Sequence, residues 1–330
     1  MSKERRFALG VWAFGKTGDR FVLSGYKESR PVEECIELAA KVPGIKGVEI
    51  NYPSQLTDQN IERIRRALKD NGLEVAAVGA DLSCSAEWAF GSLSALSREV
   101  RDKAISIGKR TVEIAAELGA SVANFWLGQD GYDYPFQADY PAAWDLLVSG
   151  LRECASVRGD VRVSLEYKPR EPRNHCFIAT AGKALCLANE IGLENVGVTI
   201  DVGHALYAYE DVAESAALLA RHKKLFHMHF NDNYRFWDDD MMVGSVHFIE
   251  YLELIYWLDR LNYEGWYSLD LFPYREDSLK TCTESIEFLN GLSNLIERIG
   301  KGQIAAHIQR GDAVGLLSMV RKYTLPDSDR

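Results

Sequence analysis

Carboxylate and imidazole side chains stand near the ends of four short apolar segments in the second half of the chain. They are Glu166 in VSLEYK, Asp201 and His204 in VTIDVGH, His229 in LFHMHFND and Asp270 in YSLDL. Oxygen and imidazole ligands without a thiolate suit a divalent cation such as Mn²⁺, Co²⁺ or Mg²⁺. Such a cation stabilises negative charge that develops on substrate oxygens. The residue types therefore predict metal-assisted chemistry, provided that the four segments meet in space.

Each of these segments has the composition of a β-strand. It is a short run of β-branched, aromatic or other apolar residues with turn residues on either side. Helical patterns separate the runs, and strands that alternate with helices form a parallel sheet. In a parallel β/α barrel the carboxyl ends of all the strands meet at one rim, where that fold places its active site. We therefore expect the four segments to deliver their side chains to one site.

The same alternation extends along the chain to about residue 300. The predicted strands are Phe7–Trp12, Gly47–Asn51, Glu74–Asp81, Ser121–Trp126, Val161–Lys168, Val196–Val202, Leu225–Asn231 and Tyr267–Leu271. The predicted helices are Val32–Lys41, Thr57–Asn71, Leu96–Leu118, Ala142–Ala155, Thr180–Glu190, Val212–Arg221, Val246–Leu261 and Ser278–Ile299. Eight such pairs favour an α/β fold closed into a (β/α)8 TIM barrel over an open doubly wound sheet.

The domain prediction is a catalytic barrel over residues 1–300 followed by a C-terminal helical extension over residues 301–330. The extension carries an apolar stripe that includes Ile304, Ile308, Val314 and Val320. An amphipathic helix must bury such a stripe somewhere. Packing on its own barrel and packing on a neighbouring subunit are both open, and a homo-oligomer is the expected assembly.

Composition argues against several classes of partner. The net charge of −10 and the pI of about 5.3 argue against nucleic acid and anionic membranes, because both require a basic face. No apolar run approaches the roughly 20 residues that span a bilayer, and the N-terminus lacks the apolar core of a signal peptide, so a cytoplasmic protein is expected. The six cysteines show no CxxC spacing, which predicts buried free thiols without disulfides or a zinc knot.

Several motifs, in the right order, resemble those of one enzyme family. The matching segments are residues 125–131 (FWLGQDG), 166–172 (EYKPREP), 201–204 (DVGH), 229–232 (HFND) and 238–240 (DDD). The second and third resemble the E-x-K-P-x-E-P and E/D-x-G-H motifs of xylose isomerase-like barrels. The last two are similar to the H-x-N-D and D-D-D of L-rhamnose isomerases, and the first resembles the W-x-G-x-x-G stretch after their fourth strand.

This resemblance implies a two-metal site and a set of ligands for it. It implies that one metal is held by Glu166, Asp201, His229 and Asp270. It implies that a second metal is bridged by Asp201 and is also held by His204, Asp238 and Asp240. In these isomerases a lysine in the position of Lys168 polarises a substrate oxygen, and side chains two residues apart on a strand share a face. The implied catalytic residues are Lys168, Glu166 and Asp270. Mn²⁺ is the expected cation, with Co²⁺ or Mg²⁺ as alternatives.

Each of these side chains also has a plainer interpretation. Glu166 and Asp270 are compatible with buried ion pairs, which is how buried charges are usually accommodated. Residues 238–240 are compatible with a solvated acidic loop. The loop after His229 is one residue longer than in the L-rhamnose isomerases, which leaves a one-metal site open. His227 shares the face of His229 one layer deeper, where a hydrogen-bonded histidine that supports a ligand is the favoured interpretation.

Further residues near the predicted rim are candidates for substrate contacts. The predicted substrate-binding residues are Trp12, Glu49, Asp81, Trp126, His204 and Trp237. The tryptophans would stack on the apolar face of a sugar, although core packing is the default for any one of them. Glu49 and Asp81 stand at strand ends, where they would contact hydroxyl groups, cap a helix or form a salt bridge. The chain has no Gly-rich phosphate loop with a lysine, so an unphosphorylated substrate is expected.

The predicted function is a divalent-metal-dependent isomerase that interconverts an aldose and a ketose by a hydride shift. The alternative is a one-metal enzyme of the same superfamily that transfers a proton next to a carbonyl. It would be a ketose 3-epimerase, or the barrel subunit of a C-glycoside deglycosidase, which uses a small β-rich partner. The isomerases open the sugar ring with a histidine from the first half of the barrel, whereas the first histidine here is His175. A barrel that binds a sugar or a partner without turnover is a third interpretation.

Overall fold

The chain folds into a closed (β/α)8 barrel, as the alternation of patterns predicts. The structure is a computed structural model that describes residues 5–19 and 21–325. Within these residues eight parallel strands close in the order β1-β11-β10-β9-β6-β4-β3-β2, because β1 pairs with both β2 and β11. The barrel strands are β1 (Arg6–Gly10), β2 (Ile45–Tyr52), β3 (Glu74–Ala80), β4 (Val122–Trp126), β6 (Arg162–Glu166), β9 (Val196–Asp201), β10 (Leu225–Phe230) and β11 (Trp266–Leu269).

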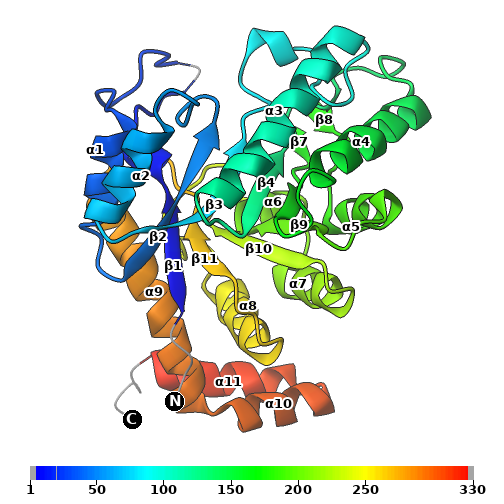
Figure 1. Ribbon diagram of the computed structural model, residues 1–330. Coiled ribbons are helices and arrows are strands. Elements are labelled where there is room, and N and C mark those ends of the chain that lie inside the picture. Colours follow the sequence, from blue (N-terminus) through cyan, green and yellow to red (C-terminus); the bar gives the residue numbers. More distant parts are fainter. Residues whose placement is uncertain (1–4, 20, 326–330) are drawn as a thin grey trace.

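Helices surround the strands (Figure 1). The outer helices are α1 (Val32–Ala39), α2 (Ile61–Asp70), α3 (Arg98–Glu117), α4 (Tyr140–Ala155), α5 (Ala181–Ile191), α7 (Val212–Arg221), α8 (Phe248–Arg260) and α9 (Ser278–Ile299). Several begin at a side chain that accepts a hydrogen bond from the backbone N–H three residues further on, namely Ser97, Asp139, Thr180, Asp211 and Asp277. Such caps satisfy backbone donors that have no partner inside the helix, which fixes where these helices start.

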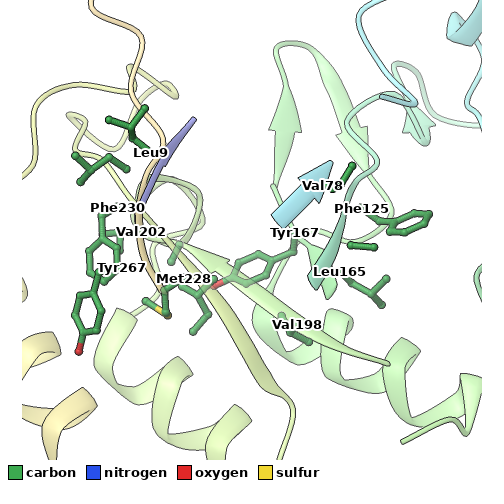
Figure 2. Close-up of a cluster of buried hydrophobic side chains, with 14 of the residues drawn as sticks. Leu9, Val78, Phe125, Leu165, Tyr167, Val198, Val202, Met228, Phe230 and Tyr267 are labelled. Carbon is green, nitrogen blue, oxygen red and sulfur yellow. The ribbon is translucent and has the colours of Figure 1, made fainter. Parts of the chain in front are cut away.

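Apolar side chains fill the layer between the strands and the helices. Figure 2 shows part of this layer, with Leu9, Val78, Phe125, Leu165 and Val198 contributed by five different strands, and all five are fully buried. Along each strand these residues alternate with side chains that point into the barrel, because successive strand residues face opposite sides. The apolar core therefore lies outside the barrel wall and leaves the barrel interior free for polar groups.

Polar side chains occupy the middle of the barrel interior. Each stands two residues before a rim position, and the set is Glu49, Asn124, Ser164, Thr199, His227 and Ser268, all of them buried. Hydrogen bonds join strands that are not neighbours in the barrel. Thr199 Oγ1 donates to Asn124 Oδ1 at 2.7 Å, and His227 Nε2 lies 2.7 Å from Glu49 Oε1. This polar layer supports the rim from below.

Several strands end at other residues than predicted, and two of these differences bear on the site. Trp12 lies in the 3-10 helix η1 (Val11–Phe14) rather than in the first strand. A Cβ atom at Gly10 would lie 2.1 Å from the Trp12 ring, so the glycine allows the indole to lie over the strand end. Lys168 lies beyond the end of β6, because its N–H bonds to the carbonyl of Ile178 rather than to a barrel neighbour.

Other differences lie in short elements. The pattern predicts α2 from Thr57, but Thr57 and Asn60 hydrogen-bond each other in a turn that precedes the helix. Within the described chain the loops also form a small antiparallel sheet and two short helices that the pattern does not predict. These are β5 (Gly131–Tyr132), β7 (Arg170–Glu171), β8 (Asn174–Cys176), η2 (Ala86–Trp88) and α6 (Val202–Tyr207). Elements of two to six residues are too short to show a recognisable period.

The C-terminal extension packs on the barrel of its own chain. Helices α10 (Lys301–Arg310) and α11 (Ala313–Thr324) contact α9 and bury Ile304 and Val320 (Figure 1). Val314 and Leu317 remain 83% and 50% exposed, so part of the apolar stripe is not covered within this chain. No helix in residues 5–19 or 21–325 has the length and apolar character needed to cross a bilayer. All six cysteines are free, and Cys84 and Cys186 are exposed rather than buried.

Candidate active site

A cavity of about 500 Å³ opens at the carboxyl ends of the barrel strands. The predicted site residues that line it are Trp12, Glu49, Asp81, Trp126, Glu166, Lys168, His204, His229, Trp237, Asp238, Asp240 and Asp270. Asp201 is fully buried behind this lining. Residues from both halves of the chain therefore meet at one rim, as the strand-end rule for barrels predicts.

The first predicted ligand set is assembled at the floor of this cavity. One ligand atom from each of Glu166, Asp201, His229 and Asp270 lies within 4.8 Å of the others. The Nδ1 atom of His229 lies 3.3 Å from Glu166 Oε1, 3.4 Å from Asp270 Oδ2 and 3.9 Å from Asp201 Oδ2. Three carboxylates thus converge on one ring nitrogen, which is the arrangement that a single divalent cation requires.

A second set shares Asp201 with the first. Ligand atoms of Asp201, His204 and Asp238 lie within 4.8 Å of one another. Asp201 caps α6, since its Oδ1 accepts the N–H of His204 at 2.8 Å, and this turn directs the imidazole back over the rim. His204 Nε2 lies 3.0 Å from Asp238 Oδ2. Asp240 is partly buried close by but stands outside this set, and its Oδ1 accepts a hydrogen bond from Asn231 at 3.1 Å.

The donor set fits divalent cations. Among the described side chains, His204 Nδ1 and Asp238 Oδ1 are buried without any hydrogen-bond partner. A buried polar atom without a partner costs free energy unless something binds it. The carboxylates of Asp201, Asp240 and Asp270 also lie close enough to repel one another. Positive charge between these groups would remove both costs.

The pKa values of these groups reflect their crowding in the metal-free site. Burial, reinforced by neighbouring carboxylates, raises the pKa of Asp201 to about 6 and that of Asp270 to about 7. Burial and the charges of Asp238, Asp270 and Asp201 raise the pKa of Asp240 well above its usual value. Burial alone would lower the pKa of His204, but Asp201 and Asp238 raise it to about 9. When no cation is bound, protons therefore offset the negative charge of this cluster.

Metal-free protein is expected to lose stability as pH rises from about 4 to about 9. Ionisation of Asp201 and Asp270 costs folding free energy as pH rises through their raised pKa values. The stabilisation from protonated His204 is present below about pH 6.5 and is lost as pH approaches 9. Bound cations replace the protons, so the gap in melting temperature between loaded and metal-free protein should widen with pH. Thermal melts of both forms at several pH values test this, and a constant gap would contradict it.

Three side chains that the sequence reasoning did not single out hold predicted site residues in place. Asn124 Nδ2 donates to Glu166 Oε2 at 2.6 Å, and Asn231 Nδ2 donates to Asp201 Oδ2 at 2.8 Å. A Cβ atom at Gly203 would lie 2.2 Å from Asn231 Oδ1, so the glycine of the DVGH segment leaves room for this amide. The third is Glu171, which bonds to Lys168. Asn124 could have been found from its position two residues before Trp126, and Asn231 from its place in the HFND segment.

The remaining predicted residues take different places around the cavity. Trp12 is a ligand support as well as a wall, because its Nε1 donates to Asp270 Oδ1 at 2.7 Å. Trp126 Nε1 is buried and has no hydrogen-bond partner in the part of the chain that the structure describes, which leaves a donor available to a bound molecule. Asp81 lines the cavity, and Trp237 stands at its mouth, 44% exposed. Glu49 contacts His227 and His229, so its carboxylate is already engaged inside the barrel.

Lys168 is enclosed by negative and aromatic groups. Its Nζ lies 2.7 Å from Asp238 Oδ2, bonds to Glu171 and stands 4.9 Å from the centre of the Trp126 ring. Burial would lower the pKa of this lysine, but Asp238 and Glu171 raise it well above its usual value. Lys168 therefore keeps its proton, which suits a group that stabilises negative charge on an oxygen and does not suit a base.

Comparison with known sequences identifies relatives of this chain. A family described as xylose isomerase-like TIM barrel has a sequence model that matches residues 36–292. The xylose isomerase of Thermus thermophilus is 29% identical over 278 residues, which cover 79% of this chain and 71% of that protein. The xylose isomerase of Thermus caldophilus is 27% identical over 277 residues with the same coverage.

Comparison with solved structures gives the same fold. A D-tagatose 3-epimerase-like protein superposes with a TM-score of 0.70 at 20% identity, covering 89% of this chain and 99% of that one. The D-psicose 3-epimerase of Clostridium cellulolyticum superposes with a TM-score of 0.68 at 17% identity, covering 87% and 99%. The 3-keto-D-glucoside 4-epimerase of E. coli gives 0.65 at 20% identity, covering 87% and 100%. At such identities the likeness shows the fold alone.

Proposed function

The chain belongs to the xylose isomerase-like TIM-barrel family, and from this membership we propose that it is a divalent-metal-dependent isomerase. It would interconvert an unphosphorylated aldose and its ketose by a hydride shift between adjacent carbons. The observation that carries the proposal is the pair of ligand sets that share Asp201, with the charged Lys168 beside the second set. The two relatives described as xylose isomerases support the isomerase part of this proposal. Mn²⁺ is the proposed cation, and Co²⁺ or Mg²⁺ also suits the donors.

In the proposed reaction, the cations, Lys168 and the tryptophans have different roles. Bound divalent cations supply positive charge that stabilises the substrate oxygens while negative charge develops on them. Lys168 adds a fixed positive charge and a hydrogen-bond donor at the cavity wall, and Asp238 and Glu171 hold it there. Trp126 offers an unpartnered indole N–H to a hydroxyl group. Trp237 at the mouth narrows the cavity and limits the access of water, which strengthens the electrostatic contacts inside it.

The second candidate function is a one-metal epimerase of the same family. The observation that favours it is the absence of a histidine before His175, because ring opening would have to rely on another group such as Asp81. The solved structures described as 3-epimerases show that this fold can carry such a reaction. In this version Glu166, Asp201, His229 and Asp270 hold one cation and proton transfer replaces the hydride shift.

Isotope tracing separates the two reactions. The protein, loaded with Mn²⁺ or Co²⁺, would be incubated with a panel of free aldoses and ketoses in D₂O, and the metal would be removed before proton NMR. Isomerised product without deuterium at the transferred position indicates a hydride shift and supports the isomerase. Deuterium at that position, or a 3-epimer as product, overturns it in favour of proton transfer. No turnover of any free sugar would direct attention to a glycoside and a small β-rich partner subunit. Metal-stripped protein is the control.

Replacing both Asp238 and Asp240 by asparagine is expected to remove the second cation. Asp238 supplies a ligand oxygen of the second set, and Asp240 lies partly buried beside it. Metal content, measured after equilibrium dialysis, should fall from two equivalents to one, and turnover should fall about 100-fold or more. Asp239→Asn is the matched control from the same loop, because Asp239 only accepts a backbone hydrogen bond from Tyr234. If the double variant keeps both its stoichiometry and its rate, the second site is wrong.

A further inference from the structure

A buried hydrogen-bond chain runs from the ligand His229 away from the rim and into the barrel. His229 Nε2 lies 3.1 Å from Glu49 Oε2, and the other carboxylate oxygen, Oε1, lies 2.7 Å from His227 Nε2. The three side chains are at most 2% exposed. Glu49 comes from β2 and the histidines from β10, on strands that are not neighbours, so the chain crosses the barrel interior.

The contacts of His229 assign different roles to its two ring nitrogens. A carboxylate only accepts hydrogen bonds, so the contact with Glu49 places the proton of a neutral His229 on Nε2. The lone pair is then on Nδ1, which is the atom that faces Glu166, Asp201 and Asp270. A hydrogen bond on one ring nitrogen commonly fixes the tautomer and orientation of a histidine that binds metal through the other.

His227, which lies deeper in the barrel than His229, holds the Glu49 carboxylate in place. His227 Nε2 bonds to its second oxygen, and the two imidazole rings are nearly perpendicular, at 84° and 5.1 Å between centres. Burying a carboxylate away from the rim is costly unless both oxygens are satisfied, and here two histidines satisfy them. His227 Nδ1 has no hydrogen-bond partner within residues 5–19 and 21–325. His227 also lines a separate cavity of about 730 Å³ at the opposite end of the strands, beside Arg6, Arg162 and Trp266.

We propose that Glu49 and His227 are positioning residues that hold His229 with Nδ1 directed at the cation of the first ligand set. This inference rests on the proposed metal dependence. It replaces the substrate contact predicted for Glu49 from the sequence, because both oxygens of that carboxylate already have partners. A cation held by Glu49, His227 and His229 themselves is a competing interpretation, since their ligand atoms also lie within 4.8 Å of one another.

The test measures cation binding directly. Glu49→Ala should weaken Co²⁺ binding about 10- to 100-fold and alter the visible spectrum of the Co²⁺ protein, because the imidazole ligand is no longer held in place. Glu49→Gln keeps the shape and should lie between wild type and alanine. His227→Leu should weaken binding, whereas His227→Gln, whose amide still donates to Glu49, should restore most of it. The value of kcat should fall together with Co²⁺ affinity, whereas KM measured at saturating Co²⁺ should change little.

A matched control separates positioning from general damage to the core. Ser268 is buried in the same polar layer beside His229, and its hydroxyl has no partner among the described residues. Ser268→Ala should leave Co²⁺ affinity and spectrum unchanged, and melts of each metal-free variant would report on folding.

Each remaining outcome decides between the interpretations. If wild type binds Co²⁺ and Glu49→Ala binds it equally well with the same spectrum, positioning by Glu49 is wrong. A rise in KM alone would return Glu49 to substrate binding. Loss of one whole equivalent of Co²⁺ in both Glu49→Ala and His227→Gln would favour the competing site. Wild-type protein that binds no Co²⁺ would overturn the proposed function itself.

Discussion

Asp270→Asn is expected to abolish turnover and weaken cation binding while making the metal-free protein more stable. The effects on cation binding and on metal-free stability have opposite signs. The carboxylate binds the cation when one is present, and it repels neighbouring carboxylates when none is present. Its Oδ2 lies 3.4 Å from His229 Nδ1 and belongs to the first ligand set. Losing a charged ligand should reduce cation affinity by more than the 10- to 100-fold typical of a supporting residue, and turnover should fall at least as far.

The gain in metal-free stability follows from the raised pKa of this group. Burial, with added repulsion from Asp201 and Glu166, raises the pKa of Asp270 to about 7. Ionised Asp270 therefore destabilises the metal-free fold above that pH, and a neutral amide removes this cost. Asparagine keeps an Oδ1 that accepts the indole N–H of Trp12, so the wall of the cavity should stay in place. Melting temperatures at pH 8 with and without metal, together with metal analysis, measure both effects.

Glu210→Gln is the control for this variant. Glu210 is a half-buried carboxyl near the site that accepts hydrogen bonds from Tyr167 and from the backbone of Ala181, outside both ligand sets. Its amide variant should keep its cations and its rate. An Asp270→Asn protein that keeps full metal content would remove Asp270 from the ligand set, and one that is less stable without metal would refute the repulsion argument.

The closeness of the four proposed ligands could be predicted, because it depends only on where each side chain stands relative to the end of its own strand. Glu166, Asp201, His229 and Asp270 each follow a short apolar strand, and parallel barrel strands bring their carboxyl ends to one rim. The first three stand at or within strand ends in the structure, and Asp270 follows the last residue of β11. The only assumption about distant parts of the chain was that eight strand and helix pairs close into a barrel.

The contacts across the barrel could not be predicted in this way. Alternation along a strand shows that Glu49 and His227 both face inward, but it does not show which inward side chains touch. These two residues are separated by 178 positions, and their contact depends on the closure and register of the whole barrel. The same limit applies to Glu49, whose place near a strand end predicts a substrate contact and not its contacts with His227 and His229.

The loop that carries Asp238 and Asp240 depends on anchors that only the folded chain reveals. Asp232 accepts backbone N–H groups from Val246 and His247 and lies 2.7 Å from the His247 ring, and its own backbone pairs with Met241. These bonds close the loop at its base. Asp240 adopts a positive φ of 46°, a turn that Asp tolerates better than most residues. The acidic run alone does not distinguish such an anchored loop from a solvated one.

Lys168→Met is expected to reduce turnover strongly without loss of metal. The ammonium group carries a full positive charge, because Asp238 and Glu171 outweigh the effect of burial on its pKa. Methionine fills similar space but provides neither charge nor a donor, so kcat should fall about 100- to 1,000-fold, as for other preorganised donors. Cation affinity at the second set should hold or rise, because Asp238 loses a competing positive partner 2.7 Å away.

The metal content of Lys168→Met separates a lysine that holds the metal ligands in place from one that acts on the substrate. A lysine that only held the ligands in place would, when removed, lower metal content along with turnover. A lysine acting on substrate would lower turnover at full metal occupancy, and Lys168→Arg, which keeps the charge in a different shape, would recover part of the rate. Lys183→Met, on the exposed face of α5, controls for the loss of one positive charge. Turnover close to wild type in Lys168→Met would show that the ammonium group takes no part in the reaction and would favour chemistry in which the carboxylates alone move the proton.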